Sequence, residues 1–198
     1  MEVKSGSIEE KIIHASFEIL EKEGKSKATT KKIAQTANVS EVTLFRKFKN
    51  KKTLLKVTKD YYYNSLLEKL NQIFKFEDDE KIDEYLLNSF HKLINLDSDE
   101  LSIIKVGLRE VRENFDEYNM HLEISETIIK KLNDFFTVKI EKQEIRDVNP
   151  KILAITMFSI LFEYTVLLKV YGKPPEYDIN TYINDFLDIT LNGIKVIK

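Results

Sequence analysis

Glycine and proline are scarce in this chain, which has five Gly and three Pro in 198 residues. Strands joined by tight turns need these residues at frequent intervals, because they supply the positive or fixed φ angles of the turns. Helices joined by short connections need far fewer of them. A hydrophobic content of 42% with 32% charged residues is typical of a folded, water-soluble protein. The sequence therefore predicts an all-α fold.

The chain contains no cysteine and only three histidines. A chain without cysteine has no disulfide, no thiolate nucleophile and no cysteine-ligated metal. The sequence also lacks a nucleophile–base pair and a glycine-rich phosphate loop, and His91 and His121 have no spacing typical of metal ligands. We therefore expect no catalytic activity, no metal and no cofactor.

The charge is distributed unevenly along the chain. Residues 1–59 hold 14 Lys and Arg against 7 Asp and Glu, a net charge of +7, whereas residues 60–198 hold 17 against 26, a net charge of −9. Within 25–59 there are 11 basic residues, and Glu41 is the sole acid. Such a basic segment is typical of a surface that binds a polyanion, and nucleic acid is the first candidate.

Apolar residues at helical spacing and capping residues divide the chain into helical segments. The segment 50–74 is long enough to connect two domains, and we expect a helix-turn-helix DNA-binding domain at 1–55 and a second helical domain at 56–198. The expected helices cover approximately residues 7–24, 29–37, 40–48, 50–74, the acidic run 77–80 through 96, 98–114, 118–138, 149–171 and 178–197.

The second and third of these helices have the dimensions of a helix-turn-helix, whose second helix enters the major groove. Asn38 lies in the turn, where a left-handed backbone is needed, and asparagine tolerates that conformation. Ala34 is small enough for the two helices to approach. A small core of Ile33, Val39, Leu44 and Phe48 is expected to fix their angle. The side chains then left on the outside of the third helix are Ser40, Glu41, Thr43, Arg46 and Lys47.

A wider pattern of residues surrounds this motif. It comprises Ile12-Ile13, Ala15, Gly24, Thr29-Thr30, Ile33-Ala34, Val39-Ser40, Thr43-Leu44-Phe45, Phe48, Lys51 and Leu54. The pattern resembles the DNA-binding domain of the TetR family of transcriptional regulators over roughly residues 8–58. Asn38 stands where the family usually has glycine, and Phe45 where it usually has tyrosine. The loss of the tyrosine hydroxyl is expected to shift phosphate binding onto Arg46, Lys47 and Lys51.

The resemblance implies a role for each matching position of the motif. Thr29 or Thr30, with Lys31 beside it, would contact a backbone phosphate, and Lys51 would bind another. Phe45 would lie against the sugar–phosphate wall. Glu41 would either accept a hydrogen bond from a cytosine amino group or stabilise the start of its helix. The residues implied to face the groove are Ser40, Glu41, Thr43 and Lys47.

The second domain, by the same resemblance, binds a ligand and forms the dimer. Helices 150–171 and 178–197 would meet their symmetry mates in a four-helix bundle, so that a homodimer reads a palindromic operator in double-stranded DNA. A small apolar ligand would occupy a cavity with a few converging polar groups. The candidate ligand-binding residues are Tyr62, Phe90, His91, Arg109, Arg112, His121, Phe158 and Phe162.

The apolar stretch 152–168 allows a different interpretation, because its 17 residues contain one charge, Glu163. It is at the short limit for a bilayer span, and a helix buried in a bundle or an interface is equally apolar. Residues 1–11 are polar and resemble no targeting signal. We therefore expect a cytoplasmic homodimeric regulator, most simply a repressor released by its ligand. The alternatives are a membrane-anchored helical sensor and a small-molecule-binding helical protein without catalytic activity.

Overall fold

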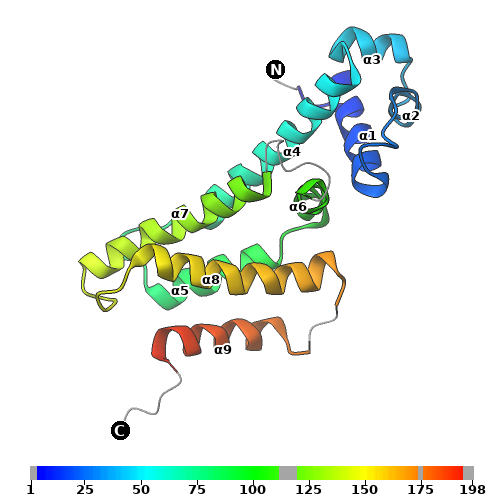
Figure 1. Cartoon of the computed structure of the whole chain (residues 1–198). Helices are drawn as coiled ribbons and strands as arrows, with labels where there is room; N and C mark the ends of the chain where they lie inside the picture. Colours follow the sequence, from blue (N-terminus) through cyan, green and yellow to red (C-terminus); the bar gives the residue numbers. More distant parts are fainter. Residues whose placement is uncertain (1–3, 112–119, 174–175, 194–198) are drawn as a thin grey trace. The chain divides into compact units, whose positions relative to one another are not determined.

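The computed structural model of the chain describes residues 4–111, 120–173 and 176–193, and these residues form helices and no strand. The all-α prediction is confirmed (Figure 1). The predicted helix ends at 112–114, 118–119 and 194–197 lie outside the described residues. The elements are α1 (Ile8–Glu23), α2 (Thr30–Thr36), α3 (Glu41–Phe48), α4 (Lys51–Ile73), α5 (Ile82–Ile94), α6 (Ser98–Val111), α7 (Met120–Glu141), α8 (Pro150–Thr165), the π-helical segment η1 (Val166–Val170) and α9 (Ile179–Asn192).

Short polar side chains begin most of the predicted helices. The Ser7 hydroxyl accepts a hydrogen bond from the Glu10 amide at 3.1 Å and so caps α1. Asn50 caps α4 by accepting from the Thr53 amide at 2.8 Å. Asn149 and Asp178 cap α8 and α9 in the same way, and Pro150 occupies the first turn of α8. These local signals are strong enough to set helix starts from sequence.

Residue contacts divide the chain into two compact units. Unit 1 comprises Met1–Leu66 and Ser98–His121, and unit 2 comprises Leu67–Asp97 and Leu122–Lys198. Helix α4 contributes residues to both units. The domain boundary between residues 55 and 56 stays a prediction.

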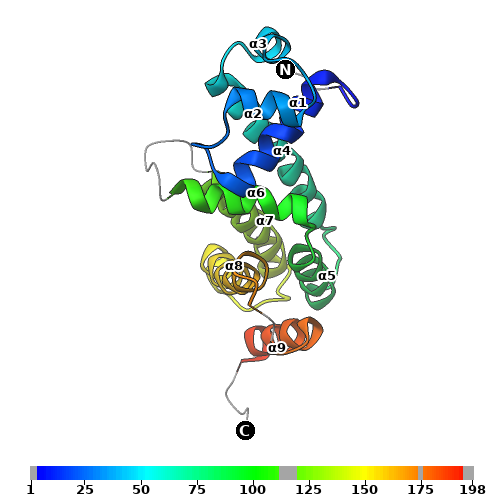
Figure 2. The same ribbon diagram turned by 90° about the vertical axis from the view of Figure 1, so that its right-hand side faces the viewer.

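Unit 1 is built around the packing of α1 on α2 and of α2 on α3, and α6 also packs on α1 (Figure 2). Ile12 and Ile13 of α1 are fully buried, as are Ile33 of α2 and Leu44 of α3. Side chains from α1, α2, α3 and the start of α4 thus share one apolar cluster. This cluster fixes the angles of α2 and α3, which are too short to be stable alone. The buried members are Ile12, Ile13, Ala15, Ile19, Ala28, Ile33, Ala34, Ala37, Leu44, Phe48, Leu54 and Leu55.

Unit 2 has an aromatic core. The rings of Tyr85 and Phe135 are stacked with centroids 3.9 Å apart, and the Tyr85 hydroxyl donates to the Phe74 carbonyl at 3.3 Å. Burial raises the pKa of Tyr85, so this donor stays protonated. Helix α5 packs on α9, and Phe90 meets Phe186 there. Both figures show α5 beside α9.

Helix α8 and its π-helical extension form the most apolar segment. Among the described residues, Pro150–Lys169 is the one helix long and apolar enough to cross a bilayer by length and composition. A core or interface helix of a soluble protein meets the same criteria. Ala154, Met157 and Leu161 are buried in unit 2, whereas Ile152 is 64% exposed.

Candidate nucleic-acid interface

The turn between α2 and α3 is tight and well defined. Asn38 has φ 53°, so the prediction of a left-handed residue is confirmed. The amide of Val39 donates to the Ala34 carbonyl at 2.9 Å, which closes the end of α2. With Leu44 and Phe48 buried below, this turn fixes α3 as a second helix presented at an angle to the first.

The outward face of α3 differs from the expected one. Val42 and Phe45 are exposed, at 77% and 43%, and Glu41 and Arg46 are exposed beside them. Thr43, which was expected to face outward, is half-buried. Sequence reasoning missed the exposure of Val42. Helical periodicity contains the signal, because at 100° per residue Val42 lies about 160° from the buried Leu44, on the opposite face of α3.

The predicted contact hydroxyls lie at the starts of α2 and α3. Thr29 caps α2 by accepting from the Lys32 amide at 3.3 Å. Ser40 caps α3 by accepting from the Thr43 amide at 3.1 Å, and the two hydroxyl oxygens are 3.0 Å apart. The Thr30 hydroxyl donates to Glu41 at 3.0 Å, which joins α2 to α3. Accepting this hydrogen bond from Thr30 is a third role for Glu41, in addition to the two that were predicted.

Two of the predicted phosphate-binding lysines are engaged within the protein. The Lys47 ammonium lies 2.5 Å from the Glu9 carboxylate of α1, and this hydrogen bond holds the pKa of Glu9 below its usual range. The Lys51 ammonium donates to the Lys25 carbonyl at 3.0 Å. Lys31 and Arg46 are exposed, with no ion-pair partner among the described residues. Their charges are directly available to a polyanion.

Similarity to known proteins agrees with this geometry. The model of the bacterial regulatory proteins of the tetR family matches residues 12–58. The chain is 32% identical over 156 residues to the uncharacterized HTH-type transcriptional regulator YvkB of Bacillus subtilis (strain 168), which covers 79% of this chain and 80% of YvkB. The chain belongs to the TetR family.

Solved structures share the fold over nearly the whole length of this TetR-family chain. A TetR-family regulator from Mesorhizobium loti MAFF303099 superposes with a TM-score of 0.73 at 14% identity, covering 96% of each chain. FadR from Bacillus subtilis in complex with stearoyl-CoA superposes with a TM-score of 0.67 at 22% identity, covering 94% of this chain and 99% of FadR. At these identities the likeness establishes the fold.

The predicted ligand residues of the TetR-family chain are not brought together as one set. Tyr62 lies in unit 1, where it stacks on Phe17 at 3.6 Å and shares a 2.5 Å hydrogen bond with His14. In unit 2, Phe158 meets Phe162 with ring centroids 5.3 Å apart. Phe90 is buried and His91 is half-buried on α5. The backbone of Arg109 lies in α6 and that of His121 in α7, and Arg112 lies outside the described residues.

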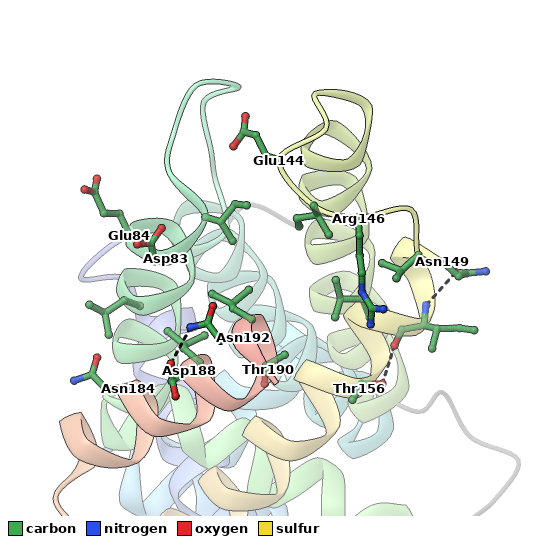
Figure 3. A pocket seen from close by; sticks show the side chains of 18 residues that line it. Asp83, Glu84, Glu144, Arg146, Asn149, Thr156, Asn184, Asp188, Thr190 and Asn192 are labelled. Carbon is green, nitrogen blue, oxygen red and sulfur yellow. Dashed lines mark hydrogen bonds between the residues drawn. The ribbon is translucent and has the colours of Figure 1, made fainter. Parts of the chain in front are cut away.

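A groove of about 1000 Å³ opens in unit 2 between α5, the 144–149 loop, α8 and α9 (Figure 3). Figure 3 shows Asp83 and Glu84 on the α5 side and Asp188 on α9, with Arg146 from the loop. Of the predicted ligand residues that the structure describes, none lines this groove. The described residues contain no cluster of His, Asp and Glu able to hold a metal.

Proposed function

We propose that this TetR-family regulator binds double-stranded DNA as a homodimer, with α3 of each copy in the major groove of a palindromic operator. The observation that carries the proposal is the geometry of α3. One face of α3 is exposed, and the buried Leu44 and Phe48 on its other face hold the helix in place. Arg46 on α3 and Lys31 on the neighbouring α2 are available to phosphates. The predicted contacts of Thr29, Thr30, Lys31, Ser40, Glu41, Thr43, Phe45, Arg46, Lys47 and Lys51 belong to this proposal.

Selection from a pool of random DNA duplexes tests the proposal. We expect the purified protein to enrich an inverted repeat whose half-sites are centred about one helical turn apart, roughly 34–36 Å. Enrichment of no sequence, with binding that depends only on salt, would contradict it.

Exposed apolar side chains on α8 and α9 support the homodimer. Ile155 and Ile160 of α8 and Ile189 of α9 each expose more than two-fifths of their surface. Apolar residues gathered on two helices are typical of a self-association surface. We propose α8 as a bundle and interface helix of a cytoplasmic protein rather than a membrane anchor. Light scattering of the protein without detergent should give twice the 23.3 kDa mass of the chain.

Release of DNA by a small apolar ligand is the regulatory part of the proposal. FadR of Bacillus subtilis was solved in complex with stearoyl-CoA, and this neighbour supports an apolar ligand of the acyl type. Phe90 and Phe158, both buried in unit 2, are candidates for the apolar wall. The ligand would bind one conformer more tightly than the other and shift the population away from the DNA-binding form. Stearoyl-CoA added to the complex with the selected duplex should release the DNA. Unchanged binding would exclude stearoyl-CoA as the releasing ligand.

Lys47 and Glu9 provide a pair of variants with opposite expected effects. We expect Lys47→Ala to weaken binding of the selected duplex about 3- to 10-fold and to reduce the salt slope by about 0.9, because one phosphate contact is lost. Glu9→Gln should strengthen binding, since Glu9 competes with phosphate for the same ammonium group. Fluorescence anisotropy over a range of salt concentrations measures both.

Two further variants complete the series, one at a predicted base contact and one as a control. Thr43→Ala should change the sequence preference while leaving the salt slope unchanged, because a hydroxyl neutralises no phosphate. Lys92→Ala, at an exposed position of α5, should leave the affinity and the salt slope unchanged. If Lys47→Ala and Glu9→Gln weaken binding equally, the ion pair serves the fold and Lys47 does not contact phosphate.

A further inference from the structure

Val42 is the most exposed large apolar side chain in the part of the chain that the structure describes, at 77%. It belongs to α3, an eight-residue helix whose other aliphatic residue, Leu44, is fully buried. Valine is a weaker helix former than alanine, leucine or lysine. Neither the core of unit 1 nor the stability of the isolated helix therefore accounts for an aliphatic residue at this position.

The position of Val42 on the helix is specific. At 100° per residue, Val42 and Phe45 lie about 60° apart, and both lie near the centre of the exposed arc of α3. Glu41 and Arg46 are exposed at the two edges of the arc. The structure therefore presents a small apolar surface, Val42 with Phe45, in the middle of the outward face.

The surroundings of this surface are cationic. Arg46 lies one turn from Val42 on the same helix, and Lys49 is exposed at the end of α3. Glu41 is the only acid among residues 25–59. A partner that complements this face must be anionic at its periphery and apolar at the point that Val42 touches. Double-stranded DNA meets both conditions, because the thymine C5-methyl is the apolar group that the major groove presents between its two phosphate backbones.

We infer that Val42 reads a thymine in each half-site by packing against the C5-methyl group of that base. The inference rests on the proposed function, since it requires α3 to lie in the major groove. Val42 would thus determine specificity together with the proposed polar contacts Ser40, Glu41 and Thr43. The contact with thymine also explains why an exposed helix position carries a branched aliphatic side chain. When α3 lies in the groove, the contact removes the valine side chain and the base methyl group from water, and this favours binding.

Replacement of thymine by uracil tests the inference, because the two bases differ by the C5-methyl alone. The selected duplex is synthesised with deoxyuridine at one thymidine position at a time, symmetrically in both half-sites, and its affinity for the wild-type protein is measured at fixed salt. We expect a loss of about fourfold per methyl at one position of the half-site, the fold-change equivalent to the ~0.8 kcal/mol of one buried CH₂ group. Val42→Ala should bind the thymidine duplex more weakly and show no further loss with deoxyuridine at that position.

Two matched variants accompany Val42→Ala, which should fold normally because the side chain is exposed. Val42→Thr has the same shape and keeps one methyl, and we expect it to retain part of the preference for thymine. Phe45→Ala should weaken binding and keep the preference. A uracil effect that vanishes in Phe45→Ala but persists in Val42→Ala would overturn the assignment to Val42.

The remaining outcomes separate this inference from the proposed function. A protein that enriches a duplex but tolerates uracil at every position overturns the inference and leaves the proposed function standing. A protein that enriches no duplex overturns both.

Discussion

Replacing Phe48 by alanine is expected to destabilise unit 1 by about 3–5 kcal/mol, the range for removing a buried phenylalanine ring. Phe48 is 1% exposed and packs in the cluster that joins α1, α2 and α3. Removal of the ring leaves a cavity. Because α2 and α3 have only seven and eight residues, they have little other packing that could compensate for it. DNA binding should be lost together with the fold of this unit. Hydrogen exchange of the α1–α3 amides measures the destabilisation in the unit itself.

Phe45 is the matched control for Phe48, because it lies three residues earlier on the same helix and is 43% exposed. Phe45→Ala should lower the free energy of unfolding by less than about 1 kcal/mol, since it removes little buried surface. It should nevertheless weaken binding of the duplex. Equal destabilisation by the two substitutions would mean that both rings belong to the core and that α3 is turned differently about its axis.

The second large effect is expected at Lys139, which is fully buried in unit 2. Its ammonium lies 3.2 Å from the Glu144 carboxylate, donates to the Asp78 carbonyl at 3.1 Å, and lies 5.6 Å from the centre of the Phe135 ring. Lys139→Ala removes a buried ammonium group that is paired with the partly exposed carboxylate of Glu144, and it opens space beside the aromatic core. We expect the free energy of unfolding to fall by about 2–3 kcal/mol. This is less than the ~3–5 kcal/mol expected when one partner of a wholly buried pair is removed, because the exposed part of Glu144 can be solvated again.

Lys142 provides the control for Lys139, because it donates to the same Asp78 carbonyl, at 2.6 Å, from an exposed position. Lys142→Ala should change the free energy of unfolding by no more than about 0.5 kcal/mol. Urea denaturation of the two variants, followed by circular dichroism, gives both values. A larger loss from Lys142→Ala than from Lys139→Ala would contradict the role assigned to the buried ammonium.

Local signals made much of the fold predictable from sequence. Ser7, Ser40 and Asn149 are cap residues. Their side chains accept hydrogen bonds from backbone amides in the first turn of the helix that each begins, so three to four residues determine each helix start. The left-handed Asn38 is equally local. The small core of Ile33, Leu44 and Phe48 followed from helical spacing within a 16-residue stretch.

Features that depend on distant residues were not predictable in this way. The Lys47–Glu9 pair joins residues 38 positions apart, and nothing near Lys47 in the sequence indicates it. Tyr62, chosen as a ligand residue for its aromatic character, instead stacks on Phe17 of α1. The burial of Lys139 depends on the 77–80 segment, whose Asp78 carbonyl accepts a hydrogen bond from the ammonium group. The groove between α5, α8 and α9 depends likewise on tertiary packing.

Site-directed cleavage of DNA tests most directly the central claim that α3 of this chain enters the major groove. The chain has no cysteine, so a Glu41→Cys variant is labelled at a single site with an iron chelate that cuts nearby DNA. An Asn184→Cys variant, exposed on α9, serves as the control. We predict strong cuts from position 41 in two clusters about one helical turn apart on the selected duplex, and none above background from position 184. Cleavage from position 41 no stronger than from position 184 would contradict the claim.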